Sequence, residues 1–553
     1  MKKSIKILFV ILVVGLLLRT LAAHNAHLNP DELAYALTPV NIISTGKIST
    51  FHQSPAYFYL TDMAYSLFGV SALTSRLTGV VFASLTILVV FLLANEFFRN
   101  KKKSLIAAFL FAVSGYAIQF NTEMDGITIF FVLLSMLFYM KGFKKDEFYL
   151  LSALFLGLGL VNKPLAALLV PLYIGHYFAR TRKFPKKRMR VVFYAALMVL
   201  IILMPIFSYN YLLYKEKNTV DIFFSSYLSD VNQNQYAGLG IDKPWNFNRF
   251  TKVAVDKAKA LLCFDAIIFL LGILGLLLAL KKKEKWTGLF ISFIALYAIF
   301  LWGKGGGGSA NHQVFFIPFL AIGATYTLLK ISSHLRLKKN VLMGVLGIIL
   351  IVNVISISDV LTEQSALGQL QDVARDFEEG SLVLVDERIY LGNVAWAFHD
   401  QNYITTKDFE QFVNQQPALP GEPEQITTYF IECVSKDCGW GRGLKDNIEI
   451  QQRADTIANV FQQGSPEGLE ITDGMDTYKV LETKSLMKAS LLPVTELGHW
   501  FYLYSVDWKA QGQEFDAYSS RGFLHKLGKV ILWIDILLIL GSIWFIFRYL
   551  FFR

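Results

Sequence analysis

Charged side chains occupy three short polar turns that separate long apolar runs. They are the adjacent carboxylates of Asp31 and Glu32, then Glu123 and Asp125, then an isolated Lys163. A carboxylate can accept the proton of a reacting hydroxyl group, and an ammonium group binds phosphate. These residue types on successive turns predict a group-transfer reaction with a phosphorylated lipid at the surface of a membrane.

Each turn also has a purely structural interpretation. Acidic residues after a proline, as at Pro30, are typical of the first turn of a helix. Acidic residues before the next apolar run, as at Asp125, often cap a helix, and Lys163 could extend to lipid headgroups. Taken singly, each turn is explained at least as well by its structural interpretation as by a catalytic one. Three such turns in succession favour a functional site.

The apolar runs between the turns are long enough for membrane helices, which need roughly 17–25 residues. Of the 553 residues, 54% are hydrophobic and only 17% are charged, whereas about a quarter are charged in soluble proteins. We expect about twelve helices. They lie near residues 7–23, 76–97, 104–120, 127–142, 148–162, 164–179, 191–209, 260–280, 287–302, 314–330, 341–358 and 527–548.

Basic residues cluster on every second connection between these helices, at 99–103, 141–145, 180–190, 281–285 and 330–339, and near both chain ends. Because cytoplasmic loops are rich in Lys and Arg, the pattern predicts a multi-pass cell-membrane protein with both termini in the cytoplasm. The polar turns and the long connections 24–75 and 210–259 would then face outward. We interpret the first apolar run as a retained helix, although a signal peptide would look similar.

The segment 359–526 differs from the rest in being acidic and soluble in character. It holds 27 Asp and Glu against 13 Lys and Arg. Residues 381–386 and 426–432 have strand-like patterns, and residues 364–377 and 448–463 have helical ones. We therefore expect an α-helical membrane domain over 1–358, an extracytoplasmic α/β domain over 359–526 and a last membrane helix within 527–553.

Charge and cysteine content exclude other classes of protein. The net charge of +10 divides into about −14 on 359–526 and +24 on the membrane part, so it indicates topology, and we expect no nucleic-acid partner. Three cysteines are too few for a disulfide scaffold or an iron–sulfur protein. Cys433 and Cys438, close together in the outward segment, favour a local disulfide, with two free thiols as the alternative.

Several short motifs resemble those of the polytopic GT-C glycosyltransferases, in particular protein O-mannosyltransferases and lipid A aminoarabinose transferases. The order and topology of the motifs match over residues 1 to about 330. The matching segments are Asp31-Glu32-Leu-Ala-Tyr35-Ala36, Pro55-Ala-Tyr57-Phe-Tyr59, Leu67-Phe68-Gly69 with Arg76-Leu77, Glu123-Met-Asp125, Leu160 to Pro164 and His312 to Pro318.

The resemblance implies a GT-C fold that transfers a sugar from a polyprenyl-phosphate donor at the outer face of the membrane. It implies Asp31 as catalytic base, with Glu32 and Asp125 also in the catalytic group. The resemblance further implies donor-phosphate binding by Lys163, Arg76 and His312. Acceptor or sugar binding would involve Tyr35, Tyr57 and Glu123. The acceptor could be a protein, a glycolipid or an envelope polysaccharide.

Two further questions remain open from the sequence. His52 stands where the aminoarabinose transferases have an acidic residue, and with Asp31 it could bind a divalent metal ion of unspecified identity. A transporter or flippase of lipid-linked sugars would use the same charges for binding alone. A membrane scaffold that recruits partners through its acidic outer domain is the other alternative.

Overall fold

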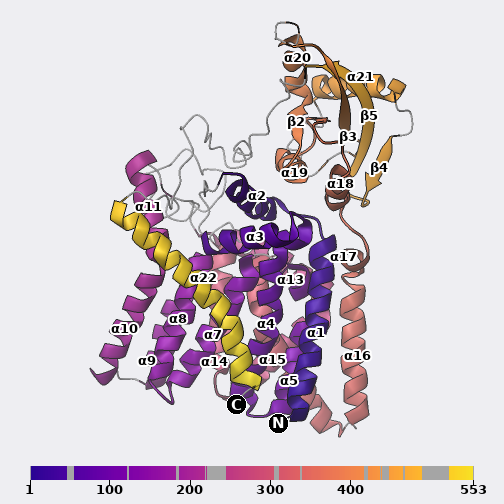
Figure 1. Ribbon diagram of the computed structural model, residues 1–553. Coiled ribbons are helices and arrows are strands. Elements are labelled where there is room, and N and C mark those ends of the chain that lie inside the picture. The colour runs from indigo at the N-terminus through magenta and orange to yellow at the C-terminus, as the bar shows by residue number, and fades with distance from the viewer. Residues whose placement is uncertain are drawn as a thin grey trace.

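The chain folds into a helical bundle with a smaller mixed α/β domain beyond one end (Figure 1). The computed structural model describes residues 2–45, 55–120, 124–181, 186–217, 220, 245–303, 311–336, 339–415, 417, 421–435, 438, 447–464, 468–488 and 522–551. Both chain ends lie at the end of the bundle that faces away from the α/β domain.

Helices occupy all twelve expected apolar segments. They are α1 (Lys2–Asn25), α4 (Ala72–Phe98), α5 (Lys101–Ala112), α6 (Gly115–Phe120), α7 (Met124–Gly142), α8 (Glu147–Asn162), η1 (Pro164–Leu168), α9 (Leu169–Thr181), α10 (Lys186–Ile202), α11 (Met204–Lys217), α13 (Phe247–Lys281), α14 (Thr287–Gly303), η2 (Asn311–Phe316), α15 (Ile317–His334), α16 (Lys339–Ile355) and α22 (Gly522–Phe551).

Fewer helices than expected can cross a membrane alone. Among the described residues, six are long and apolar enough, and the number is eight if each of two bent helix pairs forms one span. Helices α8 and α14 are apolar but shorter. The expected run 104–120 is broken between α5 and α6, and the run 164–179 begins as the short 3-10 helix η1. Hydropathy therefore located the helices correctly but did not show these breaks.

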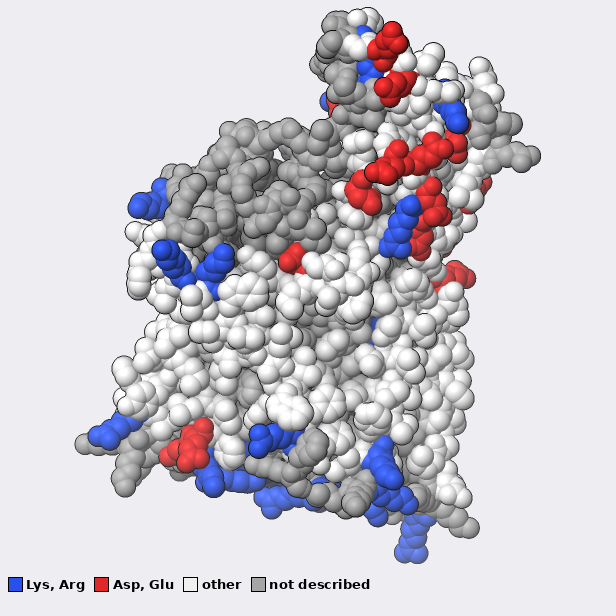
Figure 2. All heavy atoms as spheres, viewed as in Figure 1, with Lys and Arg blue, Asp and Glu red and all other residues white. Residues whose placement is uncertain are grey.

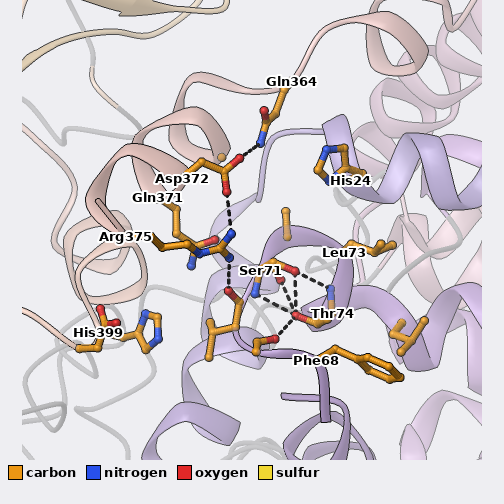
Figure 3. A pocket seen from close by; sticks show the side chains of 16 residues that line it. His24, Phe68, Ser71, Leu73, Thr74, Gln364, Gln371, Asp372, Arg375 and His399 are labelled. Atoms are coloured by element: carbon orange, nitrogen blue, oxygen red, sulfur yellow. Dashed lines mark hydrogen bonds and ion pairs between the residues drawn. The ribbon is translucent and has the colours of Figure 1, made fainter. Parts of the chain in front are cut away.

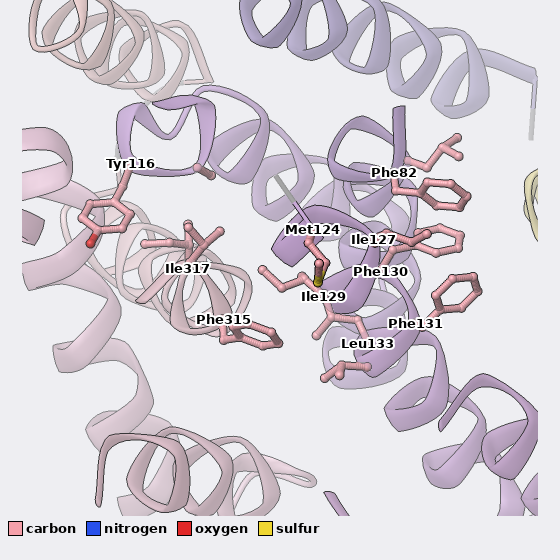
Figure 4. Packing of buried hydrophobic residues seen from close by; sticks show 14 of the residues in the cluster. Phe82, Tyr116, Met124, Ile127, Ile129, Phe130, Phe131, Leu133, Phe315 and Ile317 are labelled. Carbon is pink, nitrogen blue, oxygen red and sulfur yellow. The ribbon is translucent and has the colours of Figure 1, made fainter. Parts of the chain in front are cut away.

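Helix α7 lies at the centre of the bundle and is buried along its whole length. Figure 4 shows Phe130 and Phe131 of α7 beside Phe82 of α4, with Phe315 of η2 in the same cluster of buried residues. The ring centroids of Phe82 and Phe130 lie 5.2 Å apart. Close aromatic packing fixes the position of the α7 N-terminus, where Asp125 stands.

Small residues bring α13 and α15 into direct contact. A Cβ atom at Gly275 would overlap with the carbonyl oxygen of Gly323, and one at Gly323 would overlap with that of Gly272. Glycines at such positions let helix backbones approach closely inside a membrane. This contact holds η2, directly before α15, against the centre of the bundle.

Two helices that the apolar pattern did not identify lie across the outer end of the bundle (Figure 1). They are α2 (Pro30–Thr45) and α3 (Pro55–Phe68), and each begins with proline, whose fixed φ suits the first helical position. Tyr57 and Phe58 on α3 are buried, whereas Phe68 at its end is exposed. Both helices therefore pack across the helix ends that carry the charged turns.

The outer α/β domain contains one five-stranded sheet of order β2-β1-β3-β5-β4. Strands β2, β1 and β3 are parallel, and β5 is antiparallel to β3 and β4. The elements are α17 (Ser358–Thr362), α18 (Ala366–Ala374), β1 (Leu382–Val385), α19 (Leu391–Ala397), β2 (Asn402–Thr405), α20 (Thr406–Gln415), β3 (Glu424–Cys433), α21 (Ile448–Gly464), β4 (Leu469–Thr472) and β5 (Thr477–Met487). The expected strands and helices are present, with small shifts at their ends.

Helices cover both faces of this sheet. On one face, the cross-strand neighbours Leu384, Phe430 and Leu481 pack against Phe461 of α21. The opposite face packs against α18 and α19, where Trp396 is fully buried. Cys433 and Cys438 form a disulfide, as their spacing led us to expect.

Charge separates along the long axis of the molecule. Figure 2 shows Lys and Arg gathered at the end of the bundle that carries the two chain ends, and Asp and Glu on the α/β domain. The α/β domain rests on the membrane part through Ser365, whose N–H donates to the Asn25 carbonyl at 2.8 Å, and Arg375, which donates to the Val70 carbonyl at 2.7 Å. These contacts are next to the first charged turn.

Candidate functional site

The first charged turn is a capping box at the start of α2. The Asn29 side-chain oxygen accepts a hydrogen bond from the Glu32 N–H, and the Glu32 carboxylate accepts one from the Asn29 N–H, both at 3.0 Å. This reciprocal pair satisfies two backbone donors at the helix start and fixes where the helix begins. It makes Asp31 the second residue of α2, while Glu32 has the structural role that acidic residues after a proline suggest.

Arg76, on α4, holds this turn in place with all five of its N–H donors. Two donate to the Glu32 carboxylate, at 2.8 and 2.7 Å, and three to the carbonyl groups of Ala23, Ala26 and His27, at 2.8–2.9 Å. The Arg76 side chain is only 3% exposed. In this conformation Arg76 anchors the chain between α1 and α2 and has no donor left for phosphate. These hydrogen bonds favour a positioning role for Arg76, and its expected role in phosphate binding stays a prediction.

The second and third charged turns meet in a buried ion pair. The Lys163 ammonium donates to both carboxylate oxygens of Asp125, at 2.8 and 2.9 Å. Asp125, the second residue of α7, is 1% exposed, and Lys163, between α8 and η1, is 16% exposed. Pro164 disfavours helical backbone at the preceding residue, and Lys163 is accordingly extended, with φ −152° and ψ 125°. The proline thus ends α8 where Lys163 can reach Asp125.

His312, in η2, lies beside this ion pair. Its ring interacts electrostatically with Asp125 and Lys163. The Nδ1 atom of His312 is buried and has no hydrogen-bond partner within the part of the chain that the structure describes. A buried polar atom without a partner usually indicates a missing ligand or water. The tertiary structure therefore brings together three of the expected site residues, although more than 180 residues separate Asp125 from His312.

The two tyrosines expected to bind acceptor or sugar are neighbours in the layer formed by α2 and α3. The Tyr35 and Tyr57 rings meet edge to face with centroids 6.4 Å apart. Tyr57 is 2% exposed, and its hydroxyl donates to the Ser75 carbonyl at 3.3 Å. This arrangement gives Tyr57 a packing role between α3 and α4, while Tyr35 is only partly buried.

Three expected site residues are not characterised by the structure. Glu123 and His52 lie outside the described residues, and the side chain of Asp31 does too, although its backbone is helical. Among the described residues, no group of three or more His, Cys, Asp or Glu side chains could hold a metal ion. The possible metal site at Asp31 and His52 therefore stays a prediction.

Asp265 is a positioning residue that the sequence analysis missed. It interrupts α13 with a non-helical backbone, and its carboxylate accepts hydrogen bonds from the Ser114 hydroxyl at 2.5 Å and the Gly115 and Tyr116 N–H groups at 3.1 Å. It therefore caps α6, the helix that leads into the second charged turn. An isolated Asp within an apolar run was the available signal, since such a residue is costly unless it has partners.

Comparisons with known proteins agree with this architecture. Residues 52–209 match the family model described as dolichyl-phosphate-mannose-protein mannosyltransferase. No curated protein sequence matches the chain significantly.

Solved structures resemble nearly the whole chain. ArnT from Cupriavidus metallidurans in the apo state has 13% sequence identity and a TM-score of 0.56, over 88% of this chain and 99% of that one. The same protein bound to undecaprenyl phosphate has 14% identity and a TM-score of 0.55, over 86% and 97%. The Archaeoglobus fulgidus oligosaccharyltransferase in complex with zinc and sulfate has 14% identity and a TM-score of 0.50, over 77% and 67%. The chain therefore has the polytopic GT-C glycosyltransferase fold, and the 88% coverage means that the match to ArnT extends into the α/β domain.

Proposed function

We propose that this protein is a membrane glycosyltransferase that moves a sugar from a polyprenyl-phosphate donor to a hydroxyl group of an acceptor at the outer face of the membrane. The observation that carries the proposal is the buried Lys163–Asp125 pair with His312 beside it, at the outer ends of the helices. A desolvated ammonium group at that depth suits the phosphate of a lipid embedded in the membrane. The matching family model, and the undecaprenyl phosphate bound to the similar ArnT, support a lipid-phosphate donor.

In the proposed reaction, Asp31 takes the proton from the acceptor hydroxyl. The hydroxyl oxygen attacks the anomeric carbon of the donor sugar, and the bond between that carbon and the phosphate oxygen breaks. Polyprenyl phosphate leaves with the bonding electron pair, and the Lys163 ammonium stabilises its added negative charge. Asp125 orients Lys163, and His312, with its unpartnered Nδ1, supplies a further polar group towards the phosphate.

The role of Asp31 can be tested with Asp31→Asn, which has nearly the same size but removes the base. We expect the variant to fold, because the capping box uses Asn29 and Glu32, and to lose transfer activity. Transfer is measured with a radiolabelled lipid-linked sugar in membranes that contain the candidate acceptors. Asp359→Asn, at an exposed position on α17, is the matched control and should retain full activity. Normal transfer by Asp31→Asn would overturn the assignment of Asp31 as base.

A further inference from the structure

A pocket of about 790 Å³ lies where the outer α/β domain meets the membrane part (Figure 3). One wall comes from the turn between α3 and α4, and the opposite wall from α18 and the residues after α19. None of the residues in the ion-pair site described above lines it. The pocket is therefore a separate feature, between the outer domain and the end of the bundle.

The polar wall carries two carboxylates and one guanidinium. The Asp372 carboxylate accepts hydrogen bonds from Arg375 and from the Gln364 amide, both at 2.9 Å, and Arg375 also donates to the Val70 carbonyl. Asp400 adds a second carboxylate to the lining. Among the described lining residues, two carboxylates face one guanidinium, so the wall is net negative and does not favour an anionic ligand such as a phosphate.

Two neutral groups in the same wall can each make a further hydrogen bond. Gln371 is 2% exposed, and its amide nitrogen is buried with no acceptor among the residues that the structure describes. The Nδ1 atom of His399 lies 3.1 Å from the Trp396 carbonyl oxygen. Because a carbonyl only accepts, Nδ1 must donate in this hydrogen bond. Burial lowers the pKa of His399, so the ring is neutral and its Nε2 is an acceptor. The wall thus offers an unpartnered donor and an acceptor to a neutral ligand.

The opposite wall is largely apolar, although Ser71 and Thr74 also line it. It contains Phe68, Val70, Leu73 and Leu77, and the Phe68 side chain is 68% exposed. The faces of a sugar ring that carry only C–H groups pack well on such side chains, and so does the first part of an acyl chain. The pocket therefore combines a hydrogen-bonding wall with a largely apolar wall that includes the exposed Phe68 side chain.

We propose that this pocket binds the saccharide headgroup of a glycolipid acceptor, with its hydroxyl groups on Gln371, Asp372 and His399 and its lipid directed along Phe68. A polyhydroxylated neutral headgroup both donates and accepts hydrogen bonds, as this wall requires. The proposal rests on the proposed function, because it gives the acceptor of that reaction a chemical class. It also gives the outer domain the role of holding the acceptor.

The test uses the full chain in nanodiscs with a photoreactive diglycosyl diacylglycerol as probe. Crosslinked peptides are identified by mass spectrometry, and we expect them to come from residues 68–77 and 364–375. Gln371→Leu keeps the size of the side chain but removes its amide donor and acceptor, and it should reduce crosslinking at these peptides by about fivefold or more. Arg375→Ala should reduce it similarly, whereas Arg453→Ala, a matched control on α21 outside the pocket, should not.

Unchanged crosslinking in Gln371→Leu would overturn the inference. Equal crosslinking of these peptides by photoreactive phosphatidylglycerol would also overturn it, because the pocket would then hold any lipid. The experiment is repeated with Asp31→Asn, since binding requires no transfer. Probe binding without any transfer by the wild-type protein would contradict the proposed function alone, and transfer without probe binding would contradict only this inference.

Discussion

At the scale of single residues, the ion pair of Lys163 and Asp125 contributes both to the stability of the fold and to the proposed binding of donor phosphate. Removing two charges from water is expensive, and a buried pair is retained where the geometry is good or where the charge is needed. Lys163 bonds both oxygens of Asp125, so each charge is well satisfied. An ammonium has three N–H donors, and the two bonds to Asp125 leave one that can turn towards a donor phosphate.

A comparison of Lys163→Met with the double variant Lys163→Met/Asp125→Asn separates the contribution of Lys163 to stability from its contribution to donor binding. The single variant leaves Asp125 buried without its cation, and we expect a loss of about 3–5 kcal/mol in the free energy of unfolding. The double variant removes both charges and should recover much of that stability. The donor KM should stay raised about tenfold or more in both, because a charge-assisted hydrogen bond to phosphate is lost.

Thermal unfolding in detergent gives the stability, and initial rates at varied donor concentration give the KM. Lys141→Met, at the opposite end of α7, serves as the control for loss of a lysine. A double variant with normal donor KM would remove Lys163 from the donor site. A single variant of unchanged stability would show that Asp125 is satisfied without it.

At the scale of elements, polar side chains from distant helices fix where the site helices begin. Arg76 and the capping box define the start of α2, and Asp265 defines the start of α6. These contacts hold the turns that carry Asp31 and Asp125 at the outer end of the bundle. Such rigidity matters for catalysis, because a small displacement of a reacting group lowers the reaction rate.

Arg76→Lys tests whether anchoring of the first turn matters for activity. Lysine has three donors and no planar fork, so it cannot reproduce five hydrogen bonds to four groups. We expect kcat to fall, by up to about 100-fold, with little change in the donor KM, because α2 loses its fixed position. Measurement of kcat and KM at varied donor concentration distinguishes this outcome from a phosphate-binding role, which would raise the donor KM instead.

Arg180→Lys provides the control for an arginine-to-lysine change far from the site. Arg180 lies over the Phe143 and Trp286 rings at the opposite end of the bundle. The Arg180→Lys variant should retain normal kcat and donor KM. A normal kcat in Arg76→Lys would show that the five hydrogen bonds are not needed for activity.

At the scale of the whole molecule, the separation of charge gives the protein a direction across the membrane. Basic residues gather at one end of the bundle, and the acidic α/β domain extends from the other (Figure 2). Cytoplasmic loops carry an excess of Lys and Arg, so the bundle end with both chain ends is expected in the cytoplasm. The pocket at the base of the α/β domain and the Lys163 site would then share the outer side.

Cysteine labelling in intact cells tests this orientation. In a Cys263→Ser background, Gln463→Cys on α21 should react with a membrane-impermeant maleimide before lysis, because it is exposed on the outer domain. Ser333→Cys, exposed near the end of α15, should react only after lysis. The native Cys433–Cys438 disulfide does not react with maleimide, and the background without added cysteine controls for this. The reverse labelling pattern would contradict the expected topology.

The sequence by itself determined features that depend on local composition. Apolar length located the membrane helices, charge bias separated the basic bundle end from the acidic outer domain, and residue patterns found β1, β3 and α21. The charged turns also stood out, because a charge between apolar runs is costly and therefore rare. Short motifs in a consistent order indicated the GT-C fold.

Only the tertiary structure decided which of these charges act together. The pairing of Lys163 with Asp125, the addition of His312 and the use of Arg76 as an anchor all depend on helix packing between segments far apart in the chain. Local sequence cannot give such distances, since the same residues would suit a solvated cap or a snorkelling lysine. The pocket beside Gln371 arises only because the α/β domain docks on the turn between α3 and α4.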